Sequence, residues 1–277
     1  MRMRWIGILL FTCVGVEMVR GQDQSQLRQP HQPSRLGPEA LTTIWSFNTY
    51  AATHFADGQG WTSTVNLIDL DSTQQCLSVQ FFGNTGAAVP VPLVGYGSAQ
   101  SSVRVCLAGL GSISLQSAGT SSPLVEGWAR LACDPQESFC FGIGHIAGSI
   151  VFRNSTPGQP DLAAAVPFDD DSASHVALPF DNTNGSPTGL ALTNPQTSQN
   201  VVTLIFHGQD GAQLYITAFS LASGQHTSYL VATAYPSVAG QRGVLEITST
   251  AGLGVLALQV NPSGSFTTIF PVTSGAW

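Results

Sequence analysis

The stretch that decides the fold runs from residue 54 to residue 87, HFADGQGWTSTVNLIDLDSTQQCLSVQFFGNTGA, because its pattern returns 125 residues later. Residues 179–212, PFDNTNGSPTGLALTNPQTSQNVVTLIFHGQDGA, align with it without a gap. The two segments share eight identities: Phe55/Phe180, Gly60/Gly185, Leu67/Leu192, Gln74/Gln199, Phe81/Phe206, Gly83/Gly208, Gly86/Gly211 and Ala87/Ala212. Apolar residues at strand spacing and glycines at turns are what repeat. We therefore predict two tandem copies of one β domain, related by internal duplication.

Alternating apolar and polar residues predict that the domains are built from strands. In QCLSVQFF (75–82) every second residue is apolar, and SVRVCL (102–107) has the same period. Gly, Pro, Asn and Ser clusters separate such runs, as in β-sandwiches. We predict an all-β chain of two β-sandwiches, Ig-like or jelly-roll-like, with further strands at 61–70, 127–132, 146–153, 188–193, 201–207, 213–220, 243–248, 253–260 and 265–272. Residues 224–236, GQHTSYLVATAYP, fit a short helix that ends before Pro236.

The N-terminus predicts export. Arg2 and Arg4 precede an apolar run at 5–16, and the small residue Gly21 stands at a suitable cleavage position. Twelve apolar residues are too few to cross a bilayer, which needs about 20; acylation of Cys13 is a weaker alternative. We predict a signal peptide at 1–21, a flexible Gln/Pro-rich leader at 22–40, a first domain at 41–167 and a second at 168–277, with secretion or cell-surface location and no membrane insertion after signal removal.

The composition excludes several kinds of chemistry. The chain has no lysine, which excludes Schiff-base catalysis and a phosphate-loop lysine. A formal charge of −7 gives no basic surface for nucleic acid or anionic lipid. We expect the partner to be an extracellular protein or a glycan, and no nucleic acid.

Export would leave four of the five cysteines, in a compartment that permits disulfides. Cys76 and Cys106 fall on the polar faces of strands in one repeat, and Cys133 and Cys140 bracket the hairpin-like sequence DPQESF. We favour the pairs 76–106 and 133–140. A four-thiolate zinc site is the alternative, but C-x-x-C spacing is missing, so we predict no cofactor and no metal.

Several of these segments together resemble motifs of a family of uncharacterised exported proteins frequent in Acidobacteria. They are FADGQGWTSTVNLIDLD (55–71), EGWARLA (126–132), GSIVFR (148–153), TGLALTNP (188–195) and FTTIFPV (266–272). The resemblance covers most of residues 50–272 and implies a secreted β-rich pseudo-repeat protein, without supplying an activity. The segment CDPQESFCFGIGHIAG (133–148) departs from it and resembles an insertion with two added cysteines.

Reactive residues do not repeat between the copies. His54 aligns with Pro179 and Trp61 with Ser186, so His54 and Trp61 remain as ligand-binding residues specific to the first domain. A G-x-S-x-G motif is missing and the histidines are scattered, so we predict no catalytic residues. The acidic runs at Asp69/Asp71 and 169–171 could hold Ca²⁺, but neither has the spacing of a calcium loop, and a solvated linker is the favoured interpretation of the second run.

These observations favour a secreted, non-enzymatic structural, adhesive or interaction protein. The first alternative is a carbohydrate-binding module in which aromatic rings stack on sugars: Trp61, Tyr96, Trp128 and Tyr229. The competing interpretation of those rings is that they fill the core. A secreted hydrolase is the further alternative.

We predict that the exported protein begins at Gln22 and holds its four cysteines in two disulfides. Intact mass spectrometry of the non-reduced protein, followed by peptide mapping, measures both features. Four free thiols would contradict the oxidised, exported state.

Overall fold

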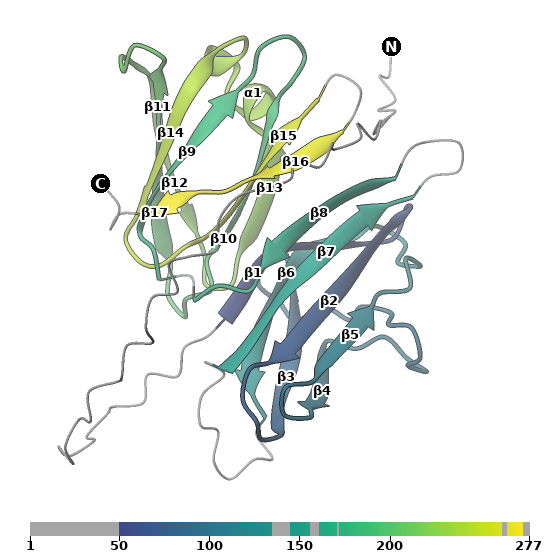
Figure 1. The fold of residues 1–277 in the computed structure, drawn as a ribbon. Coiled ribbons are helices and arrows are strands. Elements are labelled where there is room, and N and C mark those ends of the chain that lie inside the picture. The colour runs from purple at the N-terminus through teal and green to yellow at the C-terminus, as the bar shows by residue number, and fades with distance from the viewer. Residues whose placement is uncertain (1–49, 135–144, 156–160, 171, 262–264, 274–277) are drawn as a thin grey trace, which may run out of the picture.

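The computed structural model describes residues 50–134, 145–155, 161–170, 172–261 and 265–273. They form two antiparallel β-sandwiches, one after the other along the chain (Figure 1). The proposed signal peptide and leader lie outside these residues. Among the described residues, no helix has the length and apolar character needed to cross a membrane.

The first sandwich is formed by two four-stranded sheets, ordered β1-β6-β3-β4 and β5-β2-β7-β8. Its strands are β1 (Tyr50–Asp57), β2 (Trp61–Asp69), β3 (Gln75–Gly83), β4 (Ser102–Leu107), β5 (Ser112–Gln116), β6 (Val125–Cys133), β7 (Ile146–Asn154) and β8 (Leu162–Pro167).

The second sandwich has sheets ordered β12-β11-β14-β9-β17 and β13-β10-β15-β16. Its elements are β9 (His175–Asp181), β10 (Thr188–Thr193), β11 (Asn200–Gly208), β12 (Gln213–Leu221), β13 (His226–Leu230), α1 (Val231–Ala234), a 3₁₀ turn (Pro236–Val238), β14 (Arg242–Ser249), β15 (Gly254–Val260), β16 (Phe266–Ile269) and β17 (Val272–Thr273).

The two sandwiches have the same strand order. When β1 to β8 are matched in sequence with β9 to β16, β1-β6-β3-β4 corresponds to β9-β14-β11-β12, and β5-β2-β7-β8 to β13-β10-β15-β16. Aligned residues take equivalent core positions: Phe55 and Phe180 are both buried, as are Phe81 and Phe206. A common origin of the two copies stays a prediction.

The all-β class is confirmed, and two local predictions needed correction. The segment predicted as a short helix is the strand β13 followed by the single helical turn α1. The strand predicted at 265–272 breaks at Phe270-Pro271, and β17 beyond the break pairs with β9 in the opposite sheet. Proline has no N–H to donate to a ladder, so the break falls where the chain changes sheets.

The alternating strands bury the predicted faces. Leu77, Val79 and Phe81 of β3 all lie in the core of the first sandwich, together with apolar residues of both of its sheets. Each of the three is at most 2% exposed. Their neighbours on β3 therefore point away from the core, and Cys76 is one of them.

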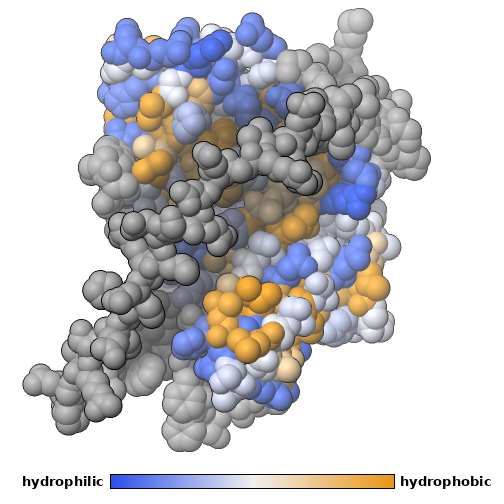
Figure 2. Space-filling model, in the orientation of Figure 1, coloured by the Kyte–Doolittle hydropathy of each residue, from blue (hydrophilic) through white to orange (hydrophobic). Residues whose placement is uncertain are grey.

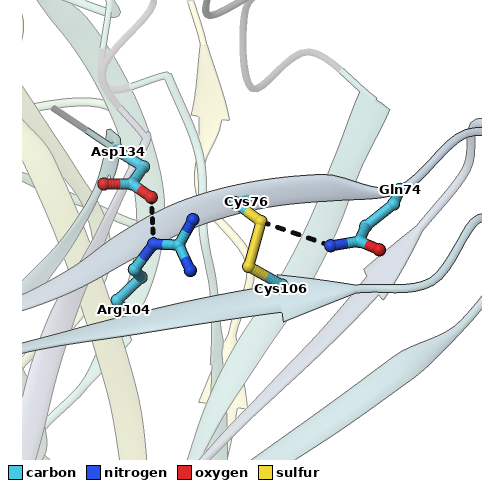
Figure 3. The surroundings of a disulfide bond; sticks show 5 residues. All are labelled: Gln74, Cys76, Arg104, Cys106 and Asp134. Carbon is cyan, nitrogen blue, oxygen red and sulfur yellow. Dashed lines mark hydrogen bonds and ion pairs between the residues drawn. A yellow bond between two sulfur atoms is a disulfide. The ribbon is translucent and has the colours of Figure 1, made fainter. Parts of the chain in front are cut away.

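Cys76 forms a disulfide with Cys106, which lies directly opposite it on β4 (Figure 3). This predicted pair is confirmed. Beside it the Arg104 side chain of β4 forms an ion pair with the carboxylate of Asp134. The bridge and the ion pair both fasten the edge strand β4.

Cys133 is the last residue of β6 and is disulfide-bonded. Cys140, its predicted partner, lies outside the described residues. The second predicted pairing therefore stays a prediction.

The two sandwiches pack on each other along β1, which lies at their boundary (Figure 1). Ala191 of β10 and Leu256 of β15 belong to the same buried apolar cluster as the first sandwich. The Trp128 indole N–H donates to the Gly224 carbonyl at 2.7 Å, so both apolar and polar contacts join the sandwiches.

The chain between the sandwiches is also held at its start. The backbone N–H groups of Ala51 and Asp169 each donate to the other residue's carbonyl, at 2.9 and 3.0 Å. The segment between β8 and β9 is thus paired with β1 at its start by two backbone hydrogen bonds.

A bulge in β1 supplies side chains to this boundary. Ala52 and Phe55 both point into the first core although they are three residues apart, because the register of β1 against β6 shifts between them. An extra residue in one strand produces such a shift. The bulge leaves Thr53 and His54 facing the second sandwich, where the Thr193 hydroxyl donates to the Thr53 carbonyl at 3.1 Å.

Some apolar side chains also reach solvent on both sandwiches (Figure 2). They include Ile68, Leu70 and Leu110 at one end of the first sandwich, and Val201, Ile216 and Val244 on the second. Single exposed apolar residues are ordinary on folded proteins, and we assign these no role.

Two glycines in equivalent strands of the two sandwiches lie against a neighbouring strand. Gly127 of β6 and Gly243 of β14 each lie so close to a neighbouring strand that a Cβ would collide with a carbonyl oxygen, of Phe82 and His207 respectively. We expect Gly127→Ala and Gly243→Ala each to lower the free energy of unfolding by about 1–3 kcal/mol, as overpacking does. Urea denaturation measures the change.

The matched control is Gly189→Ala in β10, where an added Cβ would meet Leu258 at an ordinary 3.6 Å. We expect this variant to be as stable as the parent protein or slightly more stable. Equal losses in all three variants would contradict the packing argument.

Candidate functional site

A pocket of about 250 Å³ opens between the two sandwiches. Four aromatic residues line it, namely Trp61, Phe152, Tyr229 and Phe266, and three polar residues, His54, Glu126 and Ser228. Pockets that combine apolar walls with a few convergent polar groups are the usual form of small-molecule sites. We take this interdomain pocket as the candidate site.

Both copies contribute elements to the pocket. From the first sandwich come β1 with His54, β2 with Trp61, β6 with Glu126 and β7 with Phe152. From the second come β13 with Ser228 and Tyr229, and β16 with Phe266. The pocket therefore exists only where the two sandwiches meet.

Three rings form one wall. Trp61 and Phe266 stack with centroids 6.3 Å apart and planes 16° apart, although they belong to different sandwiches. Phe152 lies 5.9 Å from each of them. Stacked rings have few rotatable bonds, so the wall is a preformed aromatic surface.

His54 is buried and belongs to a hydrogen-bonded chain across the boundary. Its Nδ1 lies 3.2 Å from Nε2 of His226, and His226 Nδ1 lies 2.7 Å from the Asn84 side-chain oxygen. The amide oxygen can only accept, so His226 Nδ1 carries a proton and His226 Nε2 accepts from His54 Nδ1. His54 Nε2 is then an unprotonated acceptor, without a hydrogen-bond partner among the described residues.

Burial keeps both imidazoles neutral. Desolvation lowers the pKa of His54 to about 4. Desolvation, and secondly the charge of a protonated His54, lower the pKa of His226 to about 3. A proton on either ring would place a charge inside the boundary, and a proton on His226 Nε2 would also face the N–H of His54 Nδ1.

Glu126 is half-buried at the pocket, and desolvation raises the pKa of its carboxyl. Its neighbour on the same face of β6, Arg130, is engaged elsewhere: it donates to the Gln80 side-chain oxygen at 2.7 and 3.1 Å and lies 4.9 Å above the Phe82 ring. Among the described residues, no ion pair or hydrogen bond reaches the Glu126 carboxyl.

Tyr229 has a partner of its own. The Tyr229 and Tyr235 hydroxyl groups are hydrogen-bonded to each other at 3.3 Å. Desolvation, then this hydrogen bond, raises the pKa of Tyr229. The Tyr229 hydroxyl stays protonated and is part of the second sandwich's aromatic cluster.

The sequence named two residues of this pocket and missed its carboxylate. His54 and Trp61 were predicted as ligand-binding residues, and the structure places both in the pocket. Tyr229, one of the rings considered for stacking, joins them. The signal for Glu126 was available, because it is a lone charge in the otherwise apolar start of strand 125–133.

The other two aromatic residues considered for stacking lie elsewhere. Trp128 is 1% exposed, so it fills the boundary and cannot stack on a sugar. Tyr96 is 41% exposed and does not line the pocket.

The acidic runs do not form a metal centre in the described residues, where no group of three His, Cys, Asp or Glu side chains is placed to hold a metal ion. Asp69 is buried, and its Oδ1 accepts the Asp71 backbone N–H at 2.9 Å, as in a local turn. Asp169 and Asp170 are exposed, while Asp171 lies outside the described residues.

A second polar cluster lies on the outer sheet of the second sandwich. The Glu246 carboxylate lies between two imidazoles, 2.9 Å from His175 Nε2 and 3.2 Å from His207 Nε2. All three side chains are between 25 and 29% exposed. The Nε2 atom of each imidazole contacts the carboxylate, so this cluster serves as a cross-strand contact.

Comparison of the chain with protein-family models, with curated proteins and with solved structures found no match.

The histidine pair predicts acid lability. In the unfolded chain both histidines titrate near pH 6.5, while the folded pKa values are about 4 and 3. Below about pH 6.5 the folded state therefore binds fewer protons than the unfolded chain. The free energy of unfolding is highest above about pH 6.5 and falls as the pH drops toward 4. Each histidine contributes a slope of up to about 1.4 kcal/mol per pH unit. Urea midpoints measured from pH 7.5 to 4 test this.

A paired comparison isolates the effect. We expect His226→Gln to have a flatter stability profile over this range than the parent protein, whereas His207→Gln, on the outer sheet, keeps the parent slope. A parent profile that is as flat as that of His226→Gln would show that the pair does not exclude protons.

Proposed function

We propose that this chain is an exported, non-enzymatic interaction protein that binds a small organic ligand between its two sandwiches. The observation that carries the proposal is the convergence of free polar groups, Glu126 and His54 Nε2, with an aromatic wall in one pocket. Export is supported by the composition of residues 1–21 and by the resemblance to exported proteins.

The contacts between the two sandwiches support a binding role for the pocket. Ligand pockets occur preferentially between domains, where two rigid bodies supply the walls. Here the hydrogen bonds from Trp128 of β6 to Gly224 and from Thr193 to Thr53 of β1 hold the sandwiches together. A preformed site loses less conformational entropy on binding than one that must assemble.

The same groups do not make a catalytic arrangement. A serine nucleophile needs a histidine within hydrogen-bond reach and a third group that orients it. Among the described residues, Ser228 makes no hydrogen bond to His54, and His54 is oriented by His226 and not by Glu126. These contacts favour binding over hydrolysis.

Carbohydrate binding is a second candidate, favoured by one observation. Trp61 and Tyr229, two of the rings that could stack on sugars, line the same pocket as an acceptor-bearing carboxyl group. A sugar ring could lie against the Trp61 wall and donate hydroxyl protons to Glu126. The test below includes saccharides for this reason.

The test is a binding screen with a blocked pocket. Ser228 is exposed at the pocket and Ser102 is exposed at the start of β4, so both tolerate a large side chain without disturbing a core. We expect ligand-observed NMR against saccharides, organic ammonium ions and neutral aromatic compounds to find a binder. Ser228→Trp should weaken it at least about tenfold, whereas Ser102→Trp should leave it unchanged.

Two outcomes would contradict the proposal. One is that no class of compound binds the parent protein. The other is that Ser228→Trp and Ser102→Trp bind equally well, which would place the ligand outside the interdomain pocket.

A further inference from the structure

We infer that the ligand of the interdomain pocket is a small organic cation, an ammonium ion with an apolar substituent. This inference rests on the proposed function and names its ligand class. It follows from the charge, the hydrogen-bonding groups and the aromatic wall of the pocket, taken in turn.

The charge of the pocket points to a cationic ligand. Glu126 brings a carboxyl group into a half-buried apolar site, and no cation reaches it among the described residues. Arg130 is held by Gln80 and Phe82, and the chain has no lysine that could serve instead. Desolvating an unpaired carboxylate is unfavourable, and a cationic ligand would remove that cost.

The hydrogen-bonding groups of the pocket point to a ligand that donates protons. The Glu126 oxygens and His54 Nε2 are acceptors without a partner among the described residues. Burial keeps the His54 ring neutral, so it cannot attract an anion. A ligand that matches this set donates protons and carries positive charge, as an ammonium group does.

The aromatic wall of the pocket also suits a cationic ligand. Trp61 and Phe266 stack across the boundary, and Phe152 lies 5.9 Å from both. The faces of such rings are electrostatically negative and attract cations, Trp most strongly. The wall therefore suits the apolar substituent and the positive charge of the same ligand.

Charge also separates this ligand from a sugar. A neutral sugar could stack on Trp61 and donate to Glu126, but it would leave the charge of the half-buried carboxylate uncompensated. An ammonium ion makes the same donor contact and neutralises the charge. The observations thus favour the cation over the second candidate.

The experiment compares isosteres on the full exported chain. The probes are phenethylammonium, its neutral analogue 2-phenylethanol, tetramethylammonium and a panel of neutral saccharides, measured by calorimetry at pH 7.5. We expect phenethylammonium to bind at least about tenfold more tightly than 2-phenylethanol, and this preference to decrease as salt is added. The comparison needs no variant, so it stands even if a substitution impairs folding.

Two variants test whether the preference for a cation comes from the Glu126 carboxylate. Glu126→Gln keeps the shape of the side chain and removes its charge, and we expect it to abolish the preference for phenethylammonium. Glu246→Gln, on the outer sheet of the second sandwich, is the matched control and should retain the preference. Equal effects of the two substitutions would overturn the assignment to Glu126.

The remaining outcomes separate this inference from the proposed function. If a saccharide or 2-phenylethanol binds at least as well as phenethylammonium, and Ser228→Trp blocks it, the cation is overturned while the binding function stands. If no probe binds the parent protein, both are overturned.

Discussion

The bulge in β1 is the constraint on which the boundary between the sandwiches depends. Ala52 and Phe55 both belong to the first core, so the strand must accommodate one extra residue between them. Regular alternation would have turned the His54 side chain into that apolar core, where its ring nitrogens would lack hydrogen-bond partners. The bulge instead presents Thr53 and His54 to the second sandwich, and both make hydrogen bonds across the boundary. The contact between the copies and the pocket beside it therefore begins with a local irregularity in one strand.

The boundary resembles a core more than a loose contact between domains. Ala191 and Leu256 of the second sandwich extend the apolar cluster of the first, and the buried histidine pair lies beside them. A polar pair in such a place needs internal partners, and the chain from His54 through His226 to Asn84 supplies them with neutral groups for every ring nitrogen except His54 Nε2. The same dryness raises the pKa of Glu126, so one physical condition links the stability of the boundary to the character of the pocket.

The two copies share a scaffold but not a site. The glycines at 127 and 243 take matching positions, because a Cβ at either would collide with the neighbouring strand, and the phenylalanines at 55 and 180 are both buried. The counterpart of His54 is Pro179, in a strand whose register against β14 is regular, so the second copy has no imidazole at the position of His54. The pocket depends on this difference between the copies, because each copy contributes different side chains to it.

The sequence by itself determined the all-β class and the alternation that buries Leu77, Val79 and Phe81, and it favoured the pairing of Cys76 with Cys106, because these depend on residue spacing within and between neighbouring strands. The opening stretch around residues 54–61 also singled out His54 and Trp61 as residues that the second copy does not repeat. The sequence did not predict β1, since a strand covered on both faces has no polar alternation. Only the tertiary structure decided that Glu126, His226 and Phe266 join His54 and Trp61, because residues up to 212 positions apart meet there through the packing of one sandwich on the other, and no local pattern records that packing.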